Sequence, residues 1–232
     1  MSEKAPKLPS HLTRYGEISL RALVDAGLGE KISLGGALGL LHYHDYRPTH
    51  DVDAWWVNAT EQDRQRVVRT ITKALEPLGA VTVRSWGDVV SIEVQDDAGK
   101  VFSFQIAQRS AQLEPAKLVP ELGVLLDSFP DLVASKMVAL VERGAPRDFR
   151  DIHAVCQAGL ITPQKCWDLW RRRQRIADSD TDHHRATLAV ETHLERIAQH
   201  RPLDEITDPE KRREAHILRE WFREVFLNAA EK

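Results

Sequence analysis

Two short motifs in the first quarter of the chain carry residue types that could act on phosphate groups. Asp51 and Asp53 lie two residues apart in the β-rich segment DVDAWWV, so the two-residue period of a strand places both carboxylates on one face. Gly35-Gly36 stands between an apolar segment and a helix-like one, where glycine lets the backbone approach an anion and free N–H groups attract it. Neighbouring carboxylates suit Mg²⁺ together with substrate phosphates, as phosphoryl and nucleotidyl transfer require. The two motifs together predict one site for a triphosphate and a metal.

The elements that must position these motifs alternate between strand and helix. The pattern predicts a strand at 31–34, a helix at 37–44 and a strand at 51–57. Thr60 and Asp63 form a capping-box-like start for a further helix. Its apolar positions recur at spacings of four, four and three, namely at Val67, Ile71, Leu75 and Leu78. Three β-like runs follow at 80–85, 89–95 and 100–107.

The second half of the chain has helical periodicity. Pro130 suits a first helical turn, and Gly144 with Pro146 ends that helix. The further helices are expected at 147–158, 163–176, 182–199 and 209–229. The predicted fold class is therefore α+β, with a mixed α/β core at 1–115 and an all-helical region at 116–232.

Composition excludes several classes of protein. The chain has 232 residues, of which 42% are hydrophobic and 29% charged, as in a globular protein rather than a disordered one. The net charge of −3 does not by itself call for a nucleic-acid partner. Two cysteines ten residues apart imply neither a disulfide framework nor a metal site. The start of the sequence lacks the apolar run of a signal peptide, and no segment approaches the roughly 18 apolar residues of a membrane span. We therefore expect a reduced, cytoplasmic protein without a membrane partner.

Two segments resemble a known family. LGGALGLLHYHDYRPTHDVDAWW at 34–56 is similar to the GG[TS]AL helix and the R-x-[ST]-x-D-[IVL]-D motif of AbiEii/AbiGii-type nucleotidyltransferase toxins, which include MenT-like tRNA-modifying enzymes. Arg47, Thr49, Asp51 and Asp53 match, whereas Ala37 replaces the usual Thr or Ser. DLVASKMVALVERGAPRDFRDIHAV at 131–155 is similar to the family block K-x-x-A-L-x-x-R-x-x-x-R-D-x-x-D. This second block supplies Lys136, Arg143, Arg147, Asp148 and Asp151.

The resemblance implies a polymerase β-like nucleotidyltransferase fold followed by helices. It also implies Mg²⁺-dependent transfer of NMP from an NTP to an RNA acceptor, a tRNA 3′ end, within a toxin–antitoxin or phage-defence system that supplies an antitoxin partner. The implied catalytic residues are Asp51, Asp53, Lys136, Asp148 and Asp151, with the metal on Asp51 and Asp53. The implied nucleotide-binding residues are Gly35, Gly36, Arg47, Thr49, Lys136 and Arg147. Asp148 or Asp151 would act as a base or as an orienting group.

One position departs from the polymerase β-like pattern. A third carboxylate is usual on a later strand, but KVFSFQIA at 100–107 has Gln105 at the expected position. Glu93 on the preceding strand is the alternative carboxylate. Two further hypotheses therefore stay open: a degenerate module that binds nucleotides without turnover, and transfer to a protein or a small molecule.

Other clusters are weaker candidates. His42 and His44 are two apart on an expected helix, so they do not share a face for a metal. Trp170 with Arg171-Arg172-Arg173 and Arg175 could contact RNA or form a solvated helix face. We take this cluster as the first candidate for acceptor docking. Of Trp55 and Trp56, one should face the core and the other could face the nucleotide, and we favour the core for both.

Overall fold

The computed structural model describes residues 5–10, 12–97 and 99–231. The chain divides into two compact units, Met1–Leu132 and Val133–Lys232, and each is described here by itself. The division falls inside helix α4, Phe129–Glu142. The architecture is mixed α+β, with a seven-stranded sheet in the first unit and helices in the second.

The first unit is built on a mixed sheet with the strand order β3-β4-β5-β2-β1-β7-β6. Its strands are β1 Ile32–Leu34, β2 Asp51–Trp56, β3 Ala80–Trp86, β4 Val89–Asp96, β5 Gly99–Ala107, β6 Lys117–Val119 and β7 Val124–Leu126. Its helices are α1 Arg14–Asp25, α2 Gly36–Leu41 and α3 Glu61–Leu75. β2 runs parallel to β5 and antiparallel to β1.

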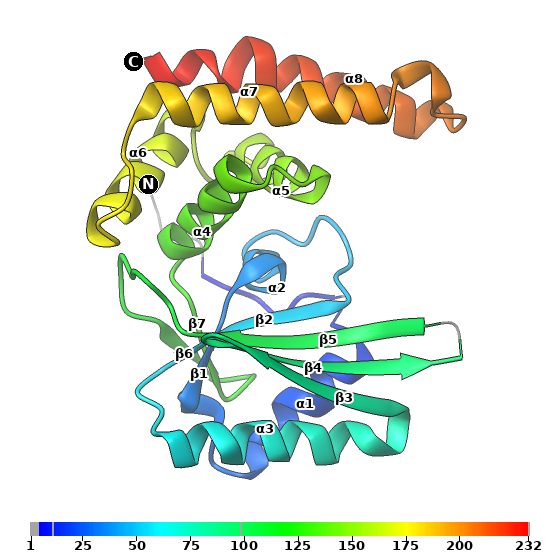
Figure 1. Cartoon of the computed structure of the whole chain (residues 1–232), viewed down its shortest axis with the longest axis vertical. Helices are drawn as coiled ribbons and strands as arrows, with labels where there is room; N and C mark the ends of the chain where they lie inside the picture. Colours follow the sequence, from blue (N-terminus) through cyan, green and yellow to red (C-terminus); the bar gives the residue numbers. More distant parts are fainter. Residues whose placement is uncertain (1–4, 11, 98, 232) are drawn as a thin grey trace. The chain divides into compact units, whose positions relative to one another are not determined.

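Alternation along the strands divides the sheet into two faces. On β2, Val52, Ala54 and Trp56 are buried in the core, whereas the residues between them are only half-buried. Helices α1 and α3 cover this core face (Figure 1). α3 begins at a complete capping box of Thr60 and Asp63, as predicted, and buries its apolar stripe there. We call the opposite face of the sheet the site face, because Asp51 and Asp53 lie on it.

The second unit contains the remaining helices. They are α5 Pro146–Gln157, α6 Pro163–Ile176, α7 His183–His200 and α8 Pro209–Trp221, with a π-helical turn at Phe222–Phe226. Aromatic rings form much of its core: the Trp167 ring packs at a tilt against Phe226, and Phe149 meets Phe222 edge to face. Among the described residues, no helix is long and apolar enough to cross a membrane.

Strands β6 and β7 are the main departure from the predicted elements, since we expected an all-helical region from residue 116. Each strand has three residues, too few for a two-residue period to be recognisable. β7 pairs in parallel with β1, so its position depends on a partner about ninety residues earlier in the chain. The sheet therefore continues beyond the expected boundary at residue 115.

Burial of His42 at the end of α2 makes stability depend on pH. Burial lowers the pKa of His42 from 6.5 to about 4, because the folded chain disfavours the charged ring. An unfolded chain binds that proton near pH 6.5, so the stabilising contribution is present above pH 6.5 and is lost as the pH falls towards 4. The full loss is about 3 kcal/mol at 1.36 kcal/mol per pKa unit. For His42→Leu, the free energy of unfolding in urea should fall less between pH 7.5 and 4.5 than it does for the wild type. His50→Leu is the control: His50 is exposed, so this variant should keep the wild-type dependence of unfolding free energy on pH. An equal pH dependence for the wild type and His42→Leu would contradict the prediction.

Candidate active site

The Asp51–Asp53 pair lies on β2, with both side chains half-buried on the site face. Asp51 is aligned with Ser103 of β5, whose hydroxyl donates to Asp51 Oδ1 at 2.7 Å. This bond fixes the direction of one carboxylate. Both carboxylates lie on the same face of β2, as the two-residue period of a strand predicted.

Gln105, at the position where the sequence comparison leads one to expect a third carboxylate, is the β5 residue aligned with Asp53. Gln105 pairs directly with Asp53, so its amide faces the same side of the sheet. Glu93 is aligned with Ser103 in the Asp51 row and lies 3.9 Å from Lys100 Nζ. Within the described part of the chain, no group of three or more His, Cys, Asp and Glu side chains could hold a metal ion. Asp53 thus has a neutral neighbour where the polymerase β-like pattern has an acid.

The Gly35-Gly36 turn adjoins this pair. The Gly35 N–H donates to the Asp53 carbonyl at 2.8 Å, and α2 begins at Gly36. A Cβ at Gly35 would lie 2.6 Å from Trp55 Nε1, and one at Gly36 would overlap the Asp53 carboxylate. Because α2 has only six residues, an anion at Gly35-Gly36 would be bound through its close approach to the backbone rather than through a helix dipole.

Gly36 offers a direct test of this packing. Its φ of 56° is left-handed, and an alanine there would cost about 1–2 kcal/mol in strain and would also displace Asp53. We expect Gly36→Ala to lower transfer activity about 100-fold, the effect of a misplaced reacting group. Gly87→Ala is the control, because φ is 53° there and no described atom lies within 4 Å of the added Cβ. Transfer activity is measured for both variants. Equal losses of activity would assign the effect to the left-handed φ alone and would contradict a role for the clash with Asp53.

Arg109 is a half-buried side chain of this region that the sequence analysis missed. It donates to Ser33 Oγ at 2.8 Å and to Asp127, and its guanidinium lies 5.5 Å from the centre of the Trp55 ring. Burial raises the pKa of Asp127, and the guanidinium only partly opposes this. Trp55 lies on the site face, so the expectation that it packs in the core with Trp56 is wrong. A strand with period two places adjacent tryptophans on opposite faces.

The second family block forms an ion cluster around two buried aspartates in the second unit. Lys136 Nζ lies 2.8 Å from Asp151 Oδ2 and 3.5 Å from Asp148 Oδ1. Arg143 donates to both oxygens of Asp148, at 2.8 and 3.0 Å. The two aspartates have no exposed surface, and Lys136 is only 6% exposed. Asp148 and Asp151 therefore supply the opposite charges for the buried ammonium of Lys136.

The remaining predicted residues lie around these groups. Thr49 is buried just before β2, within 3.5 Å of the Asp51 N–H. Arg47 donates to the Pro48 carbonyl and lies over the Tyr46 ring. Arg147 is exposed in the first turn of α5. Asp51, Asp53, Gly35 and Gly36 are thus brought together in the first unit, whereas Lys136, Asp148 and Asp151 are brought together in the second.

The arginine-rich segment of α6 does not present an aromatic surface. Trp170 is 2% exposed and meets Trp167 edge to face, and Arg173 is 6% exposed. The expectation that Trp170 stacks on RNA is wrong, because the side chain belongs to the core of the second unit. Only part of the arginine cluster is available to solvent.

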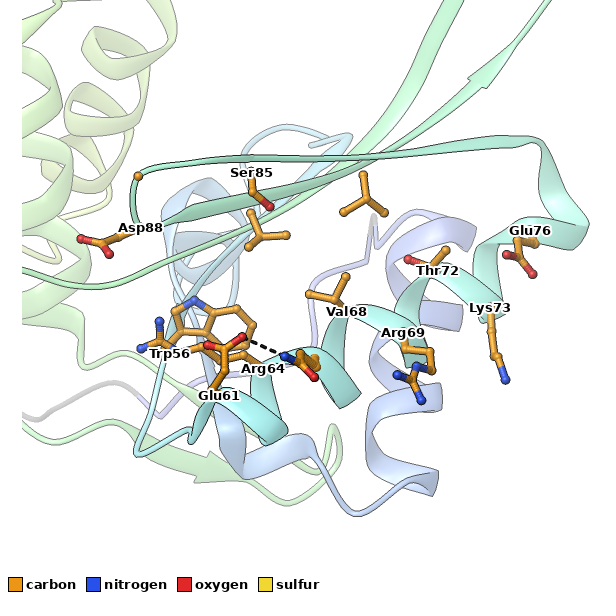
Figure 2. Close-up of a pocket in the computed structure, with 14 residues that line it drawn as sticks. Trp56, Glu61, Arg64, Val68, Arg69, Thr72, Lys73, Glu76, Ser85 and Asp88 are labelled. Atoms are coloured by element: carbon orange, nitrogen blue, oxygen red, sulfur yellow. Dashed lines mark hydrogen bonds between the residues drawn. The ribbon is translucent and has the colours of Figure 1, made fainter.

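A pocket of about 610 Å³ lies between α3 and the β3–β4 hairpin (Figure 2). Trp56, Val68 and Val90 provide apolar walls, and Arg69 and Glu76 add opposite charges. Trp56 alternates with Asp53 along β2, so this pocket opens on the core face. It is therefore separate from the Asp51–Asp53 pair.

Comparison with family models identifies the chain. Residues 18–225 match the model described as nucleotidyl transferase AbiEii toxin, type IV toxin–antitoxin system. The chain belongs to the AbiEii family. It is accordingly a nucleotidyltransferase and a toxin of this class, which implies a nucleotide substrate and an antitoxin partner. The sequence resemblance is confirmed.

Solved structures of low sequence identity resemble this AbiEii-family chain. A candidate nucleotidyltransferase from H. pylori has 15% identity and a TM-score of 0.49, with 94% of each chain covered. An antigenic nucleotidyltransferase-like protein from Paracoccidioides brasiliensis has 15% identity and a TM-score of 0.39, covering 85% of this chain and 92% of the other. A search of the curated proteins found no match.

Proposed function

We propose that this nucleotidyltransferase transfers NMP from an NTP to an RNA acceptor, a tRNA 3′ end, in a toxin–antitoxin system that serves phage defence. The observation that carries the proposal is the side-by-side placement of Asp51 and Asp53 at the Gly35-Gly36 turn. Family membership supplies the reaction class. The acceptor comes from the resemblance to tRNA-modifying members.

The donor set around Asp53 fits Mg²⁺. Two carboxylates on one face are hard oxygen ligands, and Mg²⁺ binds one or two such groups together with substrate phosphates. We propose Asp51 and Asp53 as its ligands. The bound cation would neutralise charge on the phosphates of the NTP.

The other predicted residues are assigned to binding or positioning the triphosphate. Gly35 and Gly36 let it approach the backbone, and Thr49 holds the start of β2. We propose Arg47, Arg147 and Lys136 as phosphate contacts. Asp148 and Asp151 orient Lys136, which must exchange its Asp151 partner to meet a phosphate.

A labelling experiment tests the proposal. Pure protein is incubated with each labelled NTP, Mg²⁺ and total tRNA, and the product is digested with nuclease or with protease. We expect one NTP to give a nuclease-sensitive label. Absence of label with all four NTPs contradicts the transfer, and a protease-sensitive label assigns a protein acceptor instead.

A second function follows from Gln105 in register with Asp53. Without a third acid, the chain could be a module that binds NTP and Mg²⁺ without turnover. Calorimetry with NTP and Mg²⁺ separates the two hypotheses. Tight binding together with no transfer to RNA, protein or small molecules favours the module.

A further inference from the structure

Two lateral rows of side chains cross the site face from β2 to the edge strand β3. One row contains Asp53, Gln105, Ser91 and Arg84, which are paired strand by strand. The other contains Trp55, Ala107, Val89 and Trp86 in the same register. Directly paired residues project to the same face of a sheet. Arg84 and Trp86 therefore share the site face with Asp53, three strands or about 14 Å away at the usual strand spacing.

Neighbouring residues on β3 confirm which way these side chains project. Val83 pairs with Ile92, a buried residue of the core face. Ser85 lines the pocket against α3, and Figure 2 shows it on that side of β3. Arg84 and Trp86 alternate with these residues and so project from the opposite face. Both are exposed, and Trp86 is 51% accessible.

A buried hydroxyl in the first row lacks a partner. Ser91 has no exposed surface, and its Oγ has no hydrogen-bond partner among the described residues. A buried polar atom without a hydrogen bond costs free energy, so such atoms are uncommon in folded proteins. Ser91 stands between Gln105 and Arg84, so the row contains a buried hydroxyl that the described residues leave without a hydrogen bond.

We propose that these two rows bind the single-stranded 3′ end of the RNA acceptor, with Arg84 on its phosphates, Trp86 stacked on an unpaired base, and the terminal hydroxyl at Asp53. This inference rests on the proposed function and names its acceptor surface. Arginine and an exposed aromatic ring are the pair that binds single strands, because one meets the backbone and the other the base. A duplex keeps its bases stacked and offers no free face to Trp86.

The test uses the whole chain and a 5′-fluorescein-labelled oligoribonucleotide, with binding followed by anisotropy at several salt concentrations. Trp86→Ala should weaken binding about tenfold, the usual effect of losing one stacked base. Arg84→Gln should lower the slope of log affinity against log salt by about 0.7, the effect of losing one phosphate contact to a single strand. The affinity for NTP with Mg²⁺ should not change in either variant. Thermal unfolding checks that both variants are folded.

Two controls lie on the core face. Val83→Ala removes a 43% exposed apolar side chain from the same strand, and Arg69→Gln removes an exposed cation from α3. Both should bind RNA as wild type does. If wild type does not bind the oligoribonucleotide, or if Trp86→Ala and Arg84→Gln bind it as wild type does, the docking proposal is overturned. Because binding is measured without turnover, a failure to transfer NMP counts against the proposed function alone.

Discussion

Asp53→Asn is expected to lower NMP transfer about 10²–10³-fold, the order of effect seen when a charge-stabilising group is removed from an active site. Asp53 has the glycine turn beside it and neutral Gln105 beyond it. In a site with two acids, an amide in place of one leaves a single negative charge to hold a divalent cation. Asparagine preserves the shape of the side chain, so the fold should remain intact.

The measurement is steady-state transfer with the NTP and RNA that label the wild type. Asp88→Asn is the matched control, because Asp88 is exposed in the β3–β4 turn and lines the pocket on the core face. Its activity should equal that of the wild type. An Asp53→Asn enzyme that retains more than a tenth of wild-type activity would remove Asp53 from the proposed site.

Helix α3 and strands β3, β4 and β5 could be predicted because their signals are local. α3 combines a capping box with apolar residues at helical spacing, and it begins at Glu61 as expected. β3, β4 and β5 each match a predicted β-like run within two residues of its ends. In each case, the residues that determine the element are its own neighbours in sequence.

Arg109 and Trp55 show what local signals leave out. The partners of Arg109 are Ser33 and Asp127, seventy-six and eighteen residues away, so no spacing rule connects them. The face of Trp55 could have been read from period two, since it is two residues after Asp53. The alignment of Arg84 with Asp53 needs the pairing of four strands, which the sequence does not contain in any single segment.

The second family block also contributes to the stability of the second unit, through the ion pairs of Lys136. Lys136 is 6% exposed in an apolar helix face, and burying its charge is unfavourable unless anions are close. Asp151 and Asp148 supply them, and Arg143 balances the second aspartate, so two positive and two negative charges are brought together. The ion cluster therefore joins α4 to α5 within the second unit.

Lys136→Met is expected to destabilise the second unit by about 3–5 kcal/mol, because removing one partner of a buried pair leaves the other charge without its counter-ion. The double variant Lys136→Met with Asp151→Leu should recover most of this loss, since well-packed apolar groups replace buried ion pairs at little cost. Urea unfolding of these two variants and of Asp151→Leu alone, with amide exchange in α5 as the local probe, gives the coupling energy of the cycle. If Lys136→Met costs less than about 1 kcal/mol, the ion cluster does not hold the helices together.

The folded double variant also tests the phosphate role of Lys136. Weaker NTP binding by this variant supports Lys136 as a phosphate contact, and unchanged binding contradicts it.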